Sequence, residues 1–388
     1  MAAFIHHDLR LLNPAFSSPL PDVITELEHL RRLDIRGSTP HKVFLQLKDV
    51  FHLLESLASA RIEGNHTTLA DYIDAKIMPA TAPSDALREL ANIEAAMQQV
   101  ETAVPHGQPI TEAILRGLHA TTVDGLVREG DATPGEYRSG PVQIAKANHL
   151  PPEHVLVKQY VPELVAFINR VDPPKYDLMK VALAHHRFAW IHPFRNGNGR
   201  VVRLLTYAML LKYGFRVNDM GRVLNPTAVF CSDRDQYYDM LSRADTGSDD
   251  GLEAWCVYVL TGIRDELKKV DRLANYDYLK ARILVPALAY ARERQFVTQQ
   301  EEAILAATIK AGTVRAGNIA EVLPALKATQ LTYQIKKLLA AGMLQQVEPG
   351  ARRYTIGFSN NTLLRAVIRA LEGEGFVPSA LSASGAVK

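Results

Sequence analysis

The stretch from His192 to Arg203, HPFRNGNGRVVR, contains residue types that could do chemistry on a phosphate group. Gly197 and Gly199 bracket Asn198 immediately before a strongly periodic helical pattern. Glycines at such a place let the backbone turn tightly and point several N–H groups at one spot. Those groups add to the unpaired donors and the positive dipole end of the helix that follows. The pattern therefore predicts an anion-binding site.

Two arginines strengthen this interpretation. Arg200 and Arg203 are three residues apart, so they share a face in the first helical turn. Cations there oppose the helix macrodipole at a cost of about 0.3–1 kcal/mol each, and a polyphosphate would turn that repulsion into attraction through bidentate contacts. The alternative is a glycine-rich connection with solvated arginines, but the combination of residue types favours the phosphate site.

His192 precedes this turn and is a candidate general base. A histidine beside a phosphate site can take a proton from an attacking hydroxyl, because its ordinary pKa lies near neutrality. A zinc site formed with His185 and His186 is the alternative, but no carboxylate or cysteine completes such a set in the sequence.

The elements that must position these residues are mainly helices, separated by one irregular stretch. Residues 135–152 break the helical pattern and predict a short β-hairpin or an extended flap, since Gly and Pro flank an alternating segment. Apolar periodicity predicts helices near residues 23–33, 41–63, from 68, 84–103, 111–121, 153–169, 176–190, 200–213, 234–244 and 252–273.

The pattern changes after about residue 295. Helices over 298–310, 317–322 and 327–341 are followed by MLQQVEPGARRYTIGF, which predicts two short strands around a Pro-Gly turn. Three helices and a hairpin are typical of a winged helix-turn-helix. Basic residues occur on its expected recognition helix and wing, at Lys327, Lys336, Lys337, Arg352 and Arg353.

Length and composition limit the class of protein. At 388 residues, about two or three domains are expected, and the 47% hydrophobic and 22% charged content excludes a disordered or fibrous chain. A net charge of +2 gives no global field for nucleic acid or membrane. Two cysteines cannot make a disulfide scaffold. Without a signal peptide or a long apolar span, a cytoplasmic protein with no membrane partner is expected.

The segment HPFRNGNGRVVR resembles the signature of the Fic family, HPFx(D/E)GNGRxxR, and the resemblance extends over roughly residues 91–273. It implies an all-α core with one β-hairpin flap. It also implies transfer of AMP from ATP, with Mg²⁺ or Mn²⁺, to a Ser, Thr or Tyr hydroxyl of a target protein. The expected segments are an N-terminal arm with an inhibitory helix (1–90), the Fic core (91–275), a linker helix (276–296), the winged helix-turn-helix (297–360) and a frayed C-terminal tail (361–388).

The resemblance implies roles for individual positions. His192 would be the general base and Phe194 would anchor the loop. The flap would pair with the target segment as an added strand. The remaining positions would hold the α- and β-phosphates (Gly197, Asn198, Gly199), the outer phosphates (Arg200, Arg203), the nucleotide and target at the flap (Ile144, Ala145, Lys146, Ala147) and the adenosine (Tyr237, Tyr238, Asp245).

Two positions depart from the family pattern. Asn196 stands where the family has the Asp or Glu that holds Mg²⁺. Because a neutral amide oxygen attracts Mg²⁺ less than a carboxylate does, the departure affects the expected rate more than the expected nucleotide binding. Asp245 stands where related proteins often carry Asn near the adenosine.

The segment Ser59-Ala-Arg-Ile-Glu63-Gly64 fits the family's inhibitory pattern, (S/T)xxxE(G/N). The resemblance implies that Glu63 pairs with Arg203 and occupies the space that the γ-phosphate needs. In some relatives the same glutamate assists removal of AMP, so a bifunctional enzyme is a further interpretation. A solvated glutamate is the alternative.

Other functions stay open at this point. One is a DNA-binding transcriptional regulator or a toxin–antitoxin-like factor that uses the winged helix, although such modules also dock proteins or form homodimers. Another is a related transferase that moves phosphate or a different nucleotidyl group, or that removes AMP. Self-modification is a further expectation, with Tyr72, Tyr137 and Tyr207 as candidate sites.

Overall fold

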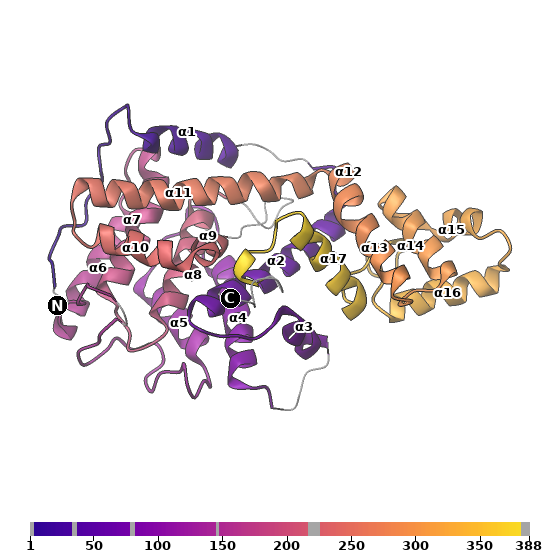
Figure 1. The fold of residues 1–388 in the computed structure, drawn as a ribbon, viewed down its shortest axis with the longest axis horizontal. Helices are drawn as coiled ribbons and strands as arrows, with labels where there is room; N and C mark the ends of the chain where they lie inside the picture. The colour runs from indigo at the N-terminus through magenta and orange to yellow at the C-terminus, as the bar shows by residue number, and fades with distance from the viewer. Residues whose placement is uncertain (1–3, 33–36, 78–81, 145–146, 216–225, 382–388) are drawn as a thin grey trace. The chain divides into compact units, whose positions relative to one another are not determined.

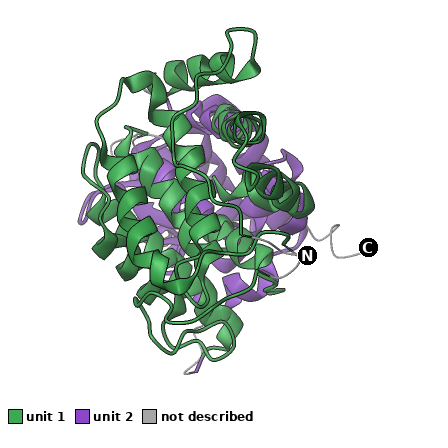
Figure 2. Cartoon of the chain, turned by 90° about the vertical axis from the view of Figure 1, so that its left-hand side faces the viewer, with its two compact units in different colours: residues 1–34, 52–67, 83–268 green, residues 35–51, 68–82, 269–388 purple. Residues whose placement is uncertain are grey.

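The computed structural model describes residues 4–32, 37–77, 82–144, 147–215 and 226–381, and most of them are helical (Figure 1). These residues divide into two compact units, coloured green and purple in Figure 2. Unit 1 comprises residues 1–34, 52–67 and 83–268, and unit 2 comprises residues 35–51, 68–82 and 269–388. The expected boundary at residue 90 does not separate compact units, because most of the N-terminal segment belongs to unit 1.

Unit 1 is built around one central helix. Every side chain of α8 from Arg200 to Leu211 is buried, and a helix covered on all sides lies inside a core. The helices α4, α5 and α7 pack against it. Unit 1 contains α1 (Pro19–Arg32), the end of α2 (His41–Ile62), α4 (Asp85–Ala103), α5 (Glu112–Val123), α6 (His154–Asn169), α7 (Asp177–Ile191), α8 (Asn198–Lys212), α9 (Thr227–Ser232), α10 (Arg234–Ala244) and most of α11 (Asp249–Asp271).

Side-chain caps explain why several of these helices begin where they do. Ser84 accepts a hydrogen bond from the Leu87 N–H at the start of α4. Thr111 accepts one from the Ile114 N–H at the start of α5. Such a cap is worth about 1 kcal/mol, because it satisfies a donor that has no partner within the helix. The helices predicted in this part of the chain are confirmed, while α9 was missed because it is only six residues long.

Of the two forms predicted for the flap, a short β-hairpin or an extended segment, the described residues have the extended one. Residues 141–144 and 147–152 are extended and irregular, with a single bridge residue at His149 and no strand. Prolines at 141, 151 and 152 explain this, because each removes an N–H that a strand ladder would need. Ala145 and Lys146, predicted at the tip of the flap, lie outside the described residues.

Unit 2 contains a small antiparallel sheet among helices. Its strands β1 (Val314–Arg315), β2 (Leu344–Gln346) and β3 (Arg353–Ile356) lie in the order β1-β3-β2. Leu344 pairs with Ile356, and Val314 with Tyr354. Its helices are α3 (Leu69–Ile77), α12 (Tyr276–Leu279), α13 (Val285–Glu293), α14 (Gln299–Ala311), α15 (Ala316–Val322), α16 (Ala328–Ala340) and α17 (Asn361–Gly373). The predicted three helices and hairpin are present, and β1 is an addition.

The predicted frayed tail at 361–388 is wrong for most of its length. Its first part forms α17, which buries Leu363, Val367 and Leu371 on one face and packs against α13. Asn360 caps the helix by accepting hydrogen bonds from the Thr362 and Leu363 N–H groups. The Ser-, Ala- and Gly-rich composition belongs to the last residues only, and residues 382–388 lie outside the described part.

Two further findings concern the whole described chain. Cys231 and Cys256 are both buried and unpaired, as the prediction of no disulfide scaffold requires. Within the described ranges, no helix combines the length and apolar character needed to cross a bilayer.

Candidate active site

The loop between α7 and α8 holds His192 in an uncommon backbone conformation. His192 has a φ of 50° and closes the end of α7, where its N–H donates to the Phe188 carbonyl at 3.0 Å. Gly197, with a φ of 74°, makes the turn into α8. Left-handed backbone is uncommon for a residue with a side chain and is often found at functional sites. The loop therefore presents His192 beside the first turn of α8.

Phe194 and Asn198 hold this loop in place. The Phe194 ring is fully buried and stacks on the His119 imidazole, with 3.8 Å between centroids and 2° between planes. The Asn198 amide accepts a hydrogen bond from the Phe194 N–H and donates one to the Phe194 carbonyl, both at 2.9 Å. The phosphate-binding role predicted for Asn198 is therefore open only to its backbone, since its side chain is used within the loop.

His119 joins the loop to the segment that precedes the flap. Its Nδ1 accepts from the Gly135 N–H at 2.9 Å, so its Nε2 carries the proton and donates to the Asn196 carbonyl at 3.2 Å. Burial lowers the pKa of His119 to about 4, which keeps the ring neutral near pH 7. The sequence analysis missed this residue, because a histidine inside a helical pattern gives no local signal.

Arg138 fastens both ends of the flap to the end of α7. Its guanidinium donates to the carbonyls of His192 (2.8 Å), Gly140 (3.1 Å) and Pro152 (2.5 Å), and its own N–H donates to the Pro193 carbonyl (2.9 Å). Only 5% of the residue is exposed. A cation also suits the carbonyl end of a helix. Arg138 was part of the segment that carried the resemblance, but the sequence predicted no role for it.

Burial keeps the His192 imidazole neutral and also makes it a weaker base than a free histidine. Desolvation lowers its pKa to about 4, with the charges of Arg138 and His149 acting in the same direction. A hydrogen bond with the Ala189 backbone and the charge of Glu63 oppose this in part. The imidazole is therefore neutral at pH 7 and ready to accept a proton.

The predicted ion pair between Glu63 and Arg203 is present. The Arg203 guanidinium donates to Glu63 Oε1 at 2.7 Å, to the Ser59 hydroxyl at 2.9 Å and to the Ser59 carbonyl at 3.0 Å. Burial alone would raise the pKa of Glu63, but the charge and hydrogen bond of Arg203 hold it below its usual value. Glu63 is therefore ionised at neutral pH.

Glu63 also fills the space at the start of α8. A Cβ placed at Gly199 would overlap the Glu63 Oε1 atom, so the carboxylate lies directly against this glycine. Glu63 is one residue past the end of α2, and Gly64 follows it with a φ of 95°. The anion position predicted from the glycines is occupied by an anion of the same chain.

Arg200 does not face an open site. It is 1% exposed, its Nη1 lies 3.0 Å from Glu89 Oε1, and its Nη2 donates to the Glu129 carbonyl at 2.7 Å. Burial raises the pKa of Glu89, although Arg200 and a hydrogen bond from Asn65 (2.8 Å) oppose that shift. The outer-phosphate role expected for Arg200 therefore requires release of this ion pair.

Asn196 points its amide within the loop. Its Oδ1 accepts from the Gly197 N–H at 2.7 Å, and its Nδ2 lies 3.3 Å from the Gly130 carbonyl and 3.5 Å from Glu129 Oε2. The described residues contain no group of three or more His, Cys, Asp or Glu side chains arranged to hold a metal ion. His185 and His186, weighed as zinc ligands, instead contact other protein groups. These are Thr206 and Tyr237 for His185 and Asp245 for His186.

Of the residues expected near the adenosine, only Tyr238 is exposed. Tyr237 is 3% exposed, and its hydroxyl lies 2.9 Å from His185 Nε2. Asp245 lies 3.0 Å from His186 Nε2. Tyr238 is 38% exposed, with the Arg234 guanidinium 5.4 Å from its ring centroid. The charge of Arg234 also lowers the pKa of Glu63, so this arginine, missed in the sequence, belongs to the electrostatic surroundings of the site.

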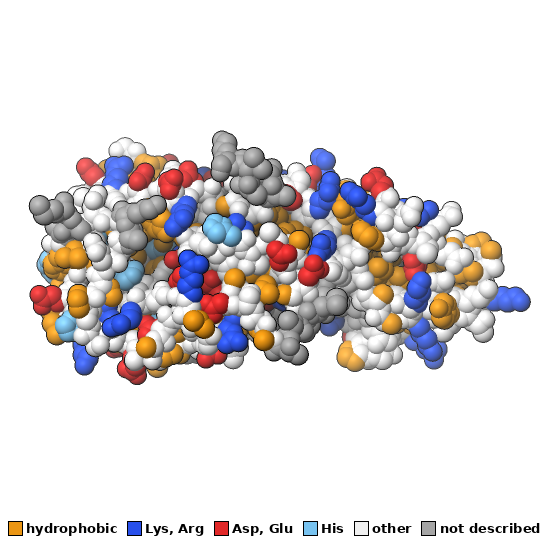
Figure 3. Space-filling model, turned by 60° about the horizontal axis from the view of Figure 1, so that its bottom comes forward, with side chains coloured by type: hydrophobic (Ala, Val, Ile, Leu, Met, Phe, Trp, Pro, Cys, Tyr) orange, Lys and Arg blue, Asp and Glu red, His pale blue; other side chains and the backbone are white. Residues whose placement is uncertain are grey.

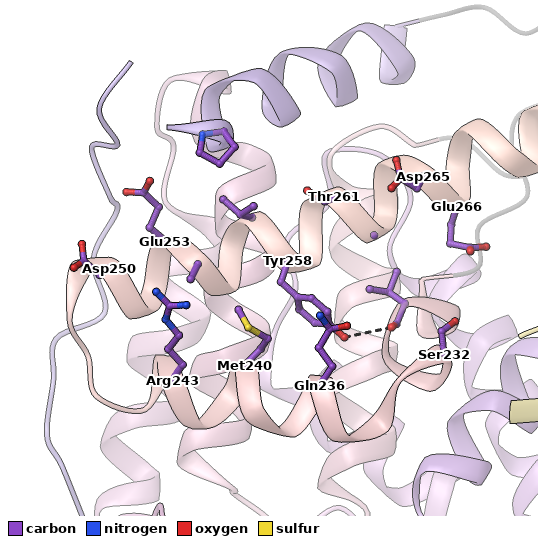
Figure 4. Close-up of a pocket in the computed structure, with 15 residues that line it drawn as sticks. Ser232, Gln236, Met240, Arg243, Asp250, Glu253, Tyr258, Thr261, Asp265 and Glu266 are labelled. Carbon is purple, nitrogen blue, oxygen red and sulfur yellow. Dashed lines mark hydrogen bonds between the residues drawn. The ribbon is translucent and has the colours of Figure 1, made fainter. Parts of the chain in front are cut away.

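A separate groove of about 770 Å³ lies along α10 and α11 (Figure 4). Tyr258 extends from α11 toward α9, where its hydroxyl donates to the Val229 carbonyl at 3.3 Å. None of the residues that line the groove belongs to the loop between α7 and α8. The groove is therefore distinct from the site around His192.

Comparison with known proteins agrees with this architecture. Residues 109–210 match the Fic/DOC family. A solved structure of a Fic family protein from Desulfovibrio desulfuricans G20 covers 89% of this chain and 98% of its own, with 22% identity and a TM-score of 0.53. A Fic domain containing signaling protein from Bacteroides thetaiotaomicron VPI-5482 covers 66% of this chain and 97% of its own, with 20% identity and a TM-score of 0.52. These likenesses concern the fold.

The chain is also similar to curated proteins. One named Protein adenylyltransferase Fic, from Nematostella vectensis, is 28% identical over 222 residues, which are 54% of this chain and 47% of that protein. Another with the same name, from Culex quinquefasciatus, is 27% identical over 201 residues, or 49% and 36% of the two chains. The chain thus spans less than half the length of these relatives.

The site lies in a helical domain in which the loop carrying His192 leads into a helix with two buried arginines, Arg200 and Arg203. The matched residues include both the loop and that helix. Residues 109–210, which carry the site, are therefore the part of the chain that is similar to the Fic/DOC family.

Proposed function

We propose that this protein is an adenylyltransferase that moves AMP from ATP to a Ser, Thr or Tyr hydroxyl of a target protein, and that Glu63 inhibits it. The observation that carries the proposal is the carboxylate of Glu63 seated on Arg203 and against Gly199 at the start of α8. A site that holds a carboxylate beside a neutral histidine has the electrostatics to hold a phosphate when that carboxylate leaves. The curated relatives named Protein adenylyltransferase Fic support the same activity.

In the proposed reaction, His192 takes the proton of the target hydroxyl. The hydroxyl oxygen forms a bond to the α-phosphorus of ATP, the bond from that phosphorus to the bridging oxygen breaks, and pyrophosphate leaves. The backbone N–H groups at the start of α8 stabilise the charge that develops on the phosphate. Arg138 acts through the His192 carbonyl as a positioning residue, because it keeps the histidine at the end of α7.

The residues around the loop fit a divalent cation that arrives with ATP. Asn196 has an amide oxygen, which accepts from the Gly197 N–H, and its amide nitrogen lies 3.5 Å from the Glu129 carboxylate, so the amide would have to turn to place its oxygen beside that carboxylate. Mg²⁺ commonly takes one or two carboxylates and completes its shell with phosphates and water. We propose that these two residues hold the ion, which when bound would screen the phosphate charge.

The target is proposed to be a protein segment that docks at the flap, where Ile144 and Ala147 are half-buried. Self-modification at two of the tyrosines considered from the sequence is disfavoured, because Tyr72 and Tyr207 are 3% and 2% exposed. Tyr137 is half-buried, and its hydroxyl donates to Glu112 at 2.9 Å. An exposed hydroxyl in another segment or in another protein is the better acceptor.

Intact-mass analysis of the full chain incubated with ATP and Mg²⁺ tests the proposal. The Glu63→Gly variant should gain the mass of AMP more than the unmodified sequence does, and the double variant with His192→Ala should gain none. A general base typically contributes about 10²–10⁴-fold in rate. The control is Glu112→Gln, which removes one negative charge outside the site.

The size of the mass gain separates the alternatives. A gain of a phosphate group would identify the related phosphotransferase instead. No gain in Glu63→Gly with any of a panel of added proteins would contradict the proposed transfer. Faster loss of AMP from a modified target when Glu63 is intact would assign the removal activity to the same site.

A further inference from the structure

The face of unit 2 formed by α16 and the β2–β3 loop carries positive charge that the rest of the unit does not neutralise. Lys327 precedes α16, Lys336 lies in its last turns and Arg352 lies in the loop, and all three are exposed. None of them takes part in an ion pair within the described residues. Several separate Lys and Arg side chains are visible among hydrophobic and other side chains at the right-hand end of Figure 3. This face is complementary to a polyanion.

Two of the basic residues noted in the sequence are already engaged. Lys337 forms an ion pair with Glu301 at 2.7 Å, and the Arg353 guanidinium donates to the Thr313 hydroxyl at 3.1 Å. Glu348 is an exposed acid in the same loop as Arg352. The cations without an ion pair are therefore Lys336 on α16, Lys327 immediately before it and Arg352 in the loop.

The exposed side of α16 also carries polar and aromatic side chains, which are types that can contact the bases of DNA. Thr329, Tyr333 and Lys336 are spaced four and three residues apart, so they form one stripe along the helix. All three are exposed, and Tyr333 is 66% exposed. The opposite side, with Leu331, Ile335 and Leu338, is buried. An aromatic ring left in solvent between hydrogen-bonding and cationic side chains is typical of an interface with a polar partner.

The geometry of α16 matches one such partner. A helix of 13 residues is about 20 Å long, and a helix with its side chains is about as wide as the major groove of B-DNA. The shorter α15 precedes it across a link of five residues, 323–327, and an antiparallel hairpin follows it. This is the order in which a winged helix-turn-helix presents its second helix to DNA.

We propose that unit 2 binds double-stranded DNA, with α16 in the major groove. Thr329 and Tyr333 contact the base edges, while Lys327, Lys336 and Arg352 contact phosphates on either side. An acidic protein would satisfy the cations, but it would make no use of the polar stripe between them. Unit 2 therefore adds a nucleic-acid site that is separate in residues from the site around His192.

Fluorescence anisotropy of the full chain with a labelled duplex tests the cationic contacts. Affinity should fall as salt rises, because each phosphate contact releases counterions. The Lys336→Glu variant should bind about tenfold more weakly or worse and show a salt slope smaller by about one. The control is Lys158→Glu, which makes the same charge change at an exposed position of α6. Circular dichroism of both variants checks that they are folded.

Three outcomes would overturn the proposal. They are no binding at low salt, equal weakening by Lys158→Glu and Lys336→Glu, or competition by polyglutamate as effective as that by unlabelled duplex. The last outcome would point to an acidic protein partner.

Selection from a random duplex library tests the reading of bases. One sequence should be enriched, and Thr329→Ala or Tyr333→Ala should change or broaden it while the salt slope stays the same. Absence of any enriched sequence would contradict the assignment of base contacts to α16.

Discussion

Two ion pairs at the start of α8 differ in kind, although their arginines are three residues apart. Glu63, which pairs with Arg203, keeps 28% of its side chain exposed and has a lowered pKa. Glu89, which pairs with Arg200, keeps 4% exposed and has a raised pKa because burial outweighs its partner. Glu63 is therefore stable in its ionised form at the edge of the site. Glu89 is enclosed, and its ionised form is disfavoured.

This difference separates a pair that can open from a pair that supports the fold. The Glu63 carboxylate, 28% exposed, can reach water more readily than that of Glu89, and Arg203 keeps its bonds to Ser59 when Glu63 leaves. We therefore expect Glu63 to control access of the nucleotide and Glu89 to hold α4 against α8. Three measurements test this contrast, and a fourth tests the proposed cation site.

The largest expected effect is on stability. Glu89→Ala removes both the partner of Arg200 and the acceptor of the Asn65 hydrogen bond, and leaving a buried charge without its partner costs about 3 kcal/mol or more. Denaturant unfolding should show a clear fall in the free energy of unfolding, while Glu63→Ala should lower it less, because Glu63 is the more exposed carboxylate. Equal losses in the two variants would remove the distinction.

The second effect is on nucleotide binding. Glu63→Gly vacates the start of α8 and frees Arg203, so ATP should bind about tenfold more tightly or better, equivalent to about 1.4 kcal/mol. Isothermal titration calorimetry with ATP and Mg²⁺ measures this. Ser59→Ala, which removes a hydroxyl from the same guanidinium but leaves the carboxylate, is the matched control. Tightening by Ser59→Ala to the same extent would contradict a specific role for the carboxylate.

The third effect is a difference in pH dependence. The pKa of folded Glu89 lies above its ordinary value of 4.5, so its contribution to stability is full below that value and is lost as pH rises through the folded pKa. The pKa of folded Glu63 lies below 4.5, so its contribution is present above that value and is lost as pH falls. When the melting temperature is plotted against pH from 4 to 8, the curve for Glu89→Gln should therefore differ in slope from that of the unmodified protein above pH 4.5. For Glu63→Gln the difference in slope should lie below pH 4.5.

The smallest expected effect concerns the cation. Asn196→Asp adds a carboxylate beside Glu129, so Mn²⁺ should bind the ATP complex a few-fold more tightly. Electron paramagnetic resonance of Mn²⁺ measures this without relying on turnover. A weaker affinity would indicate that Asn196 serves only the loop, through its bond to the Gly197 N–H.

The sequence predicted the helices and the Glu63–Arg203 contact, because both depend on local spacing or on a long motif. It could not predict the partner of Arg200, since Glu89 is 111 residues away and nothing in its own segment marks it. The same holds for His119 and Arg138, whose partners are backbone atoms of distant loops. Tyr237 was assigned to the adenosine by resemblance, whereas tertiary packing places it in the core.

The glycine that follows Glu63 has a consequence for how inhibition could end. Past Ile62 the last turn is held by hydrogen bonds from the Glu63 and Asn65 N–H groups to the Ala60 carbonyl and from the Gly64 N–H to the Arg61 carbonyl. Terminal turns of helices open at a small fraction of the free energy of global unfolding. If Glu63 inhibits as proposed, fraying of that single turn would withdraw the carboxylate while the buried body of α2 stays folded.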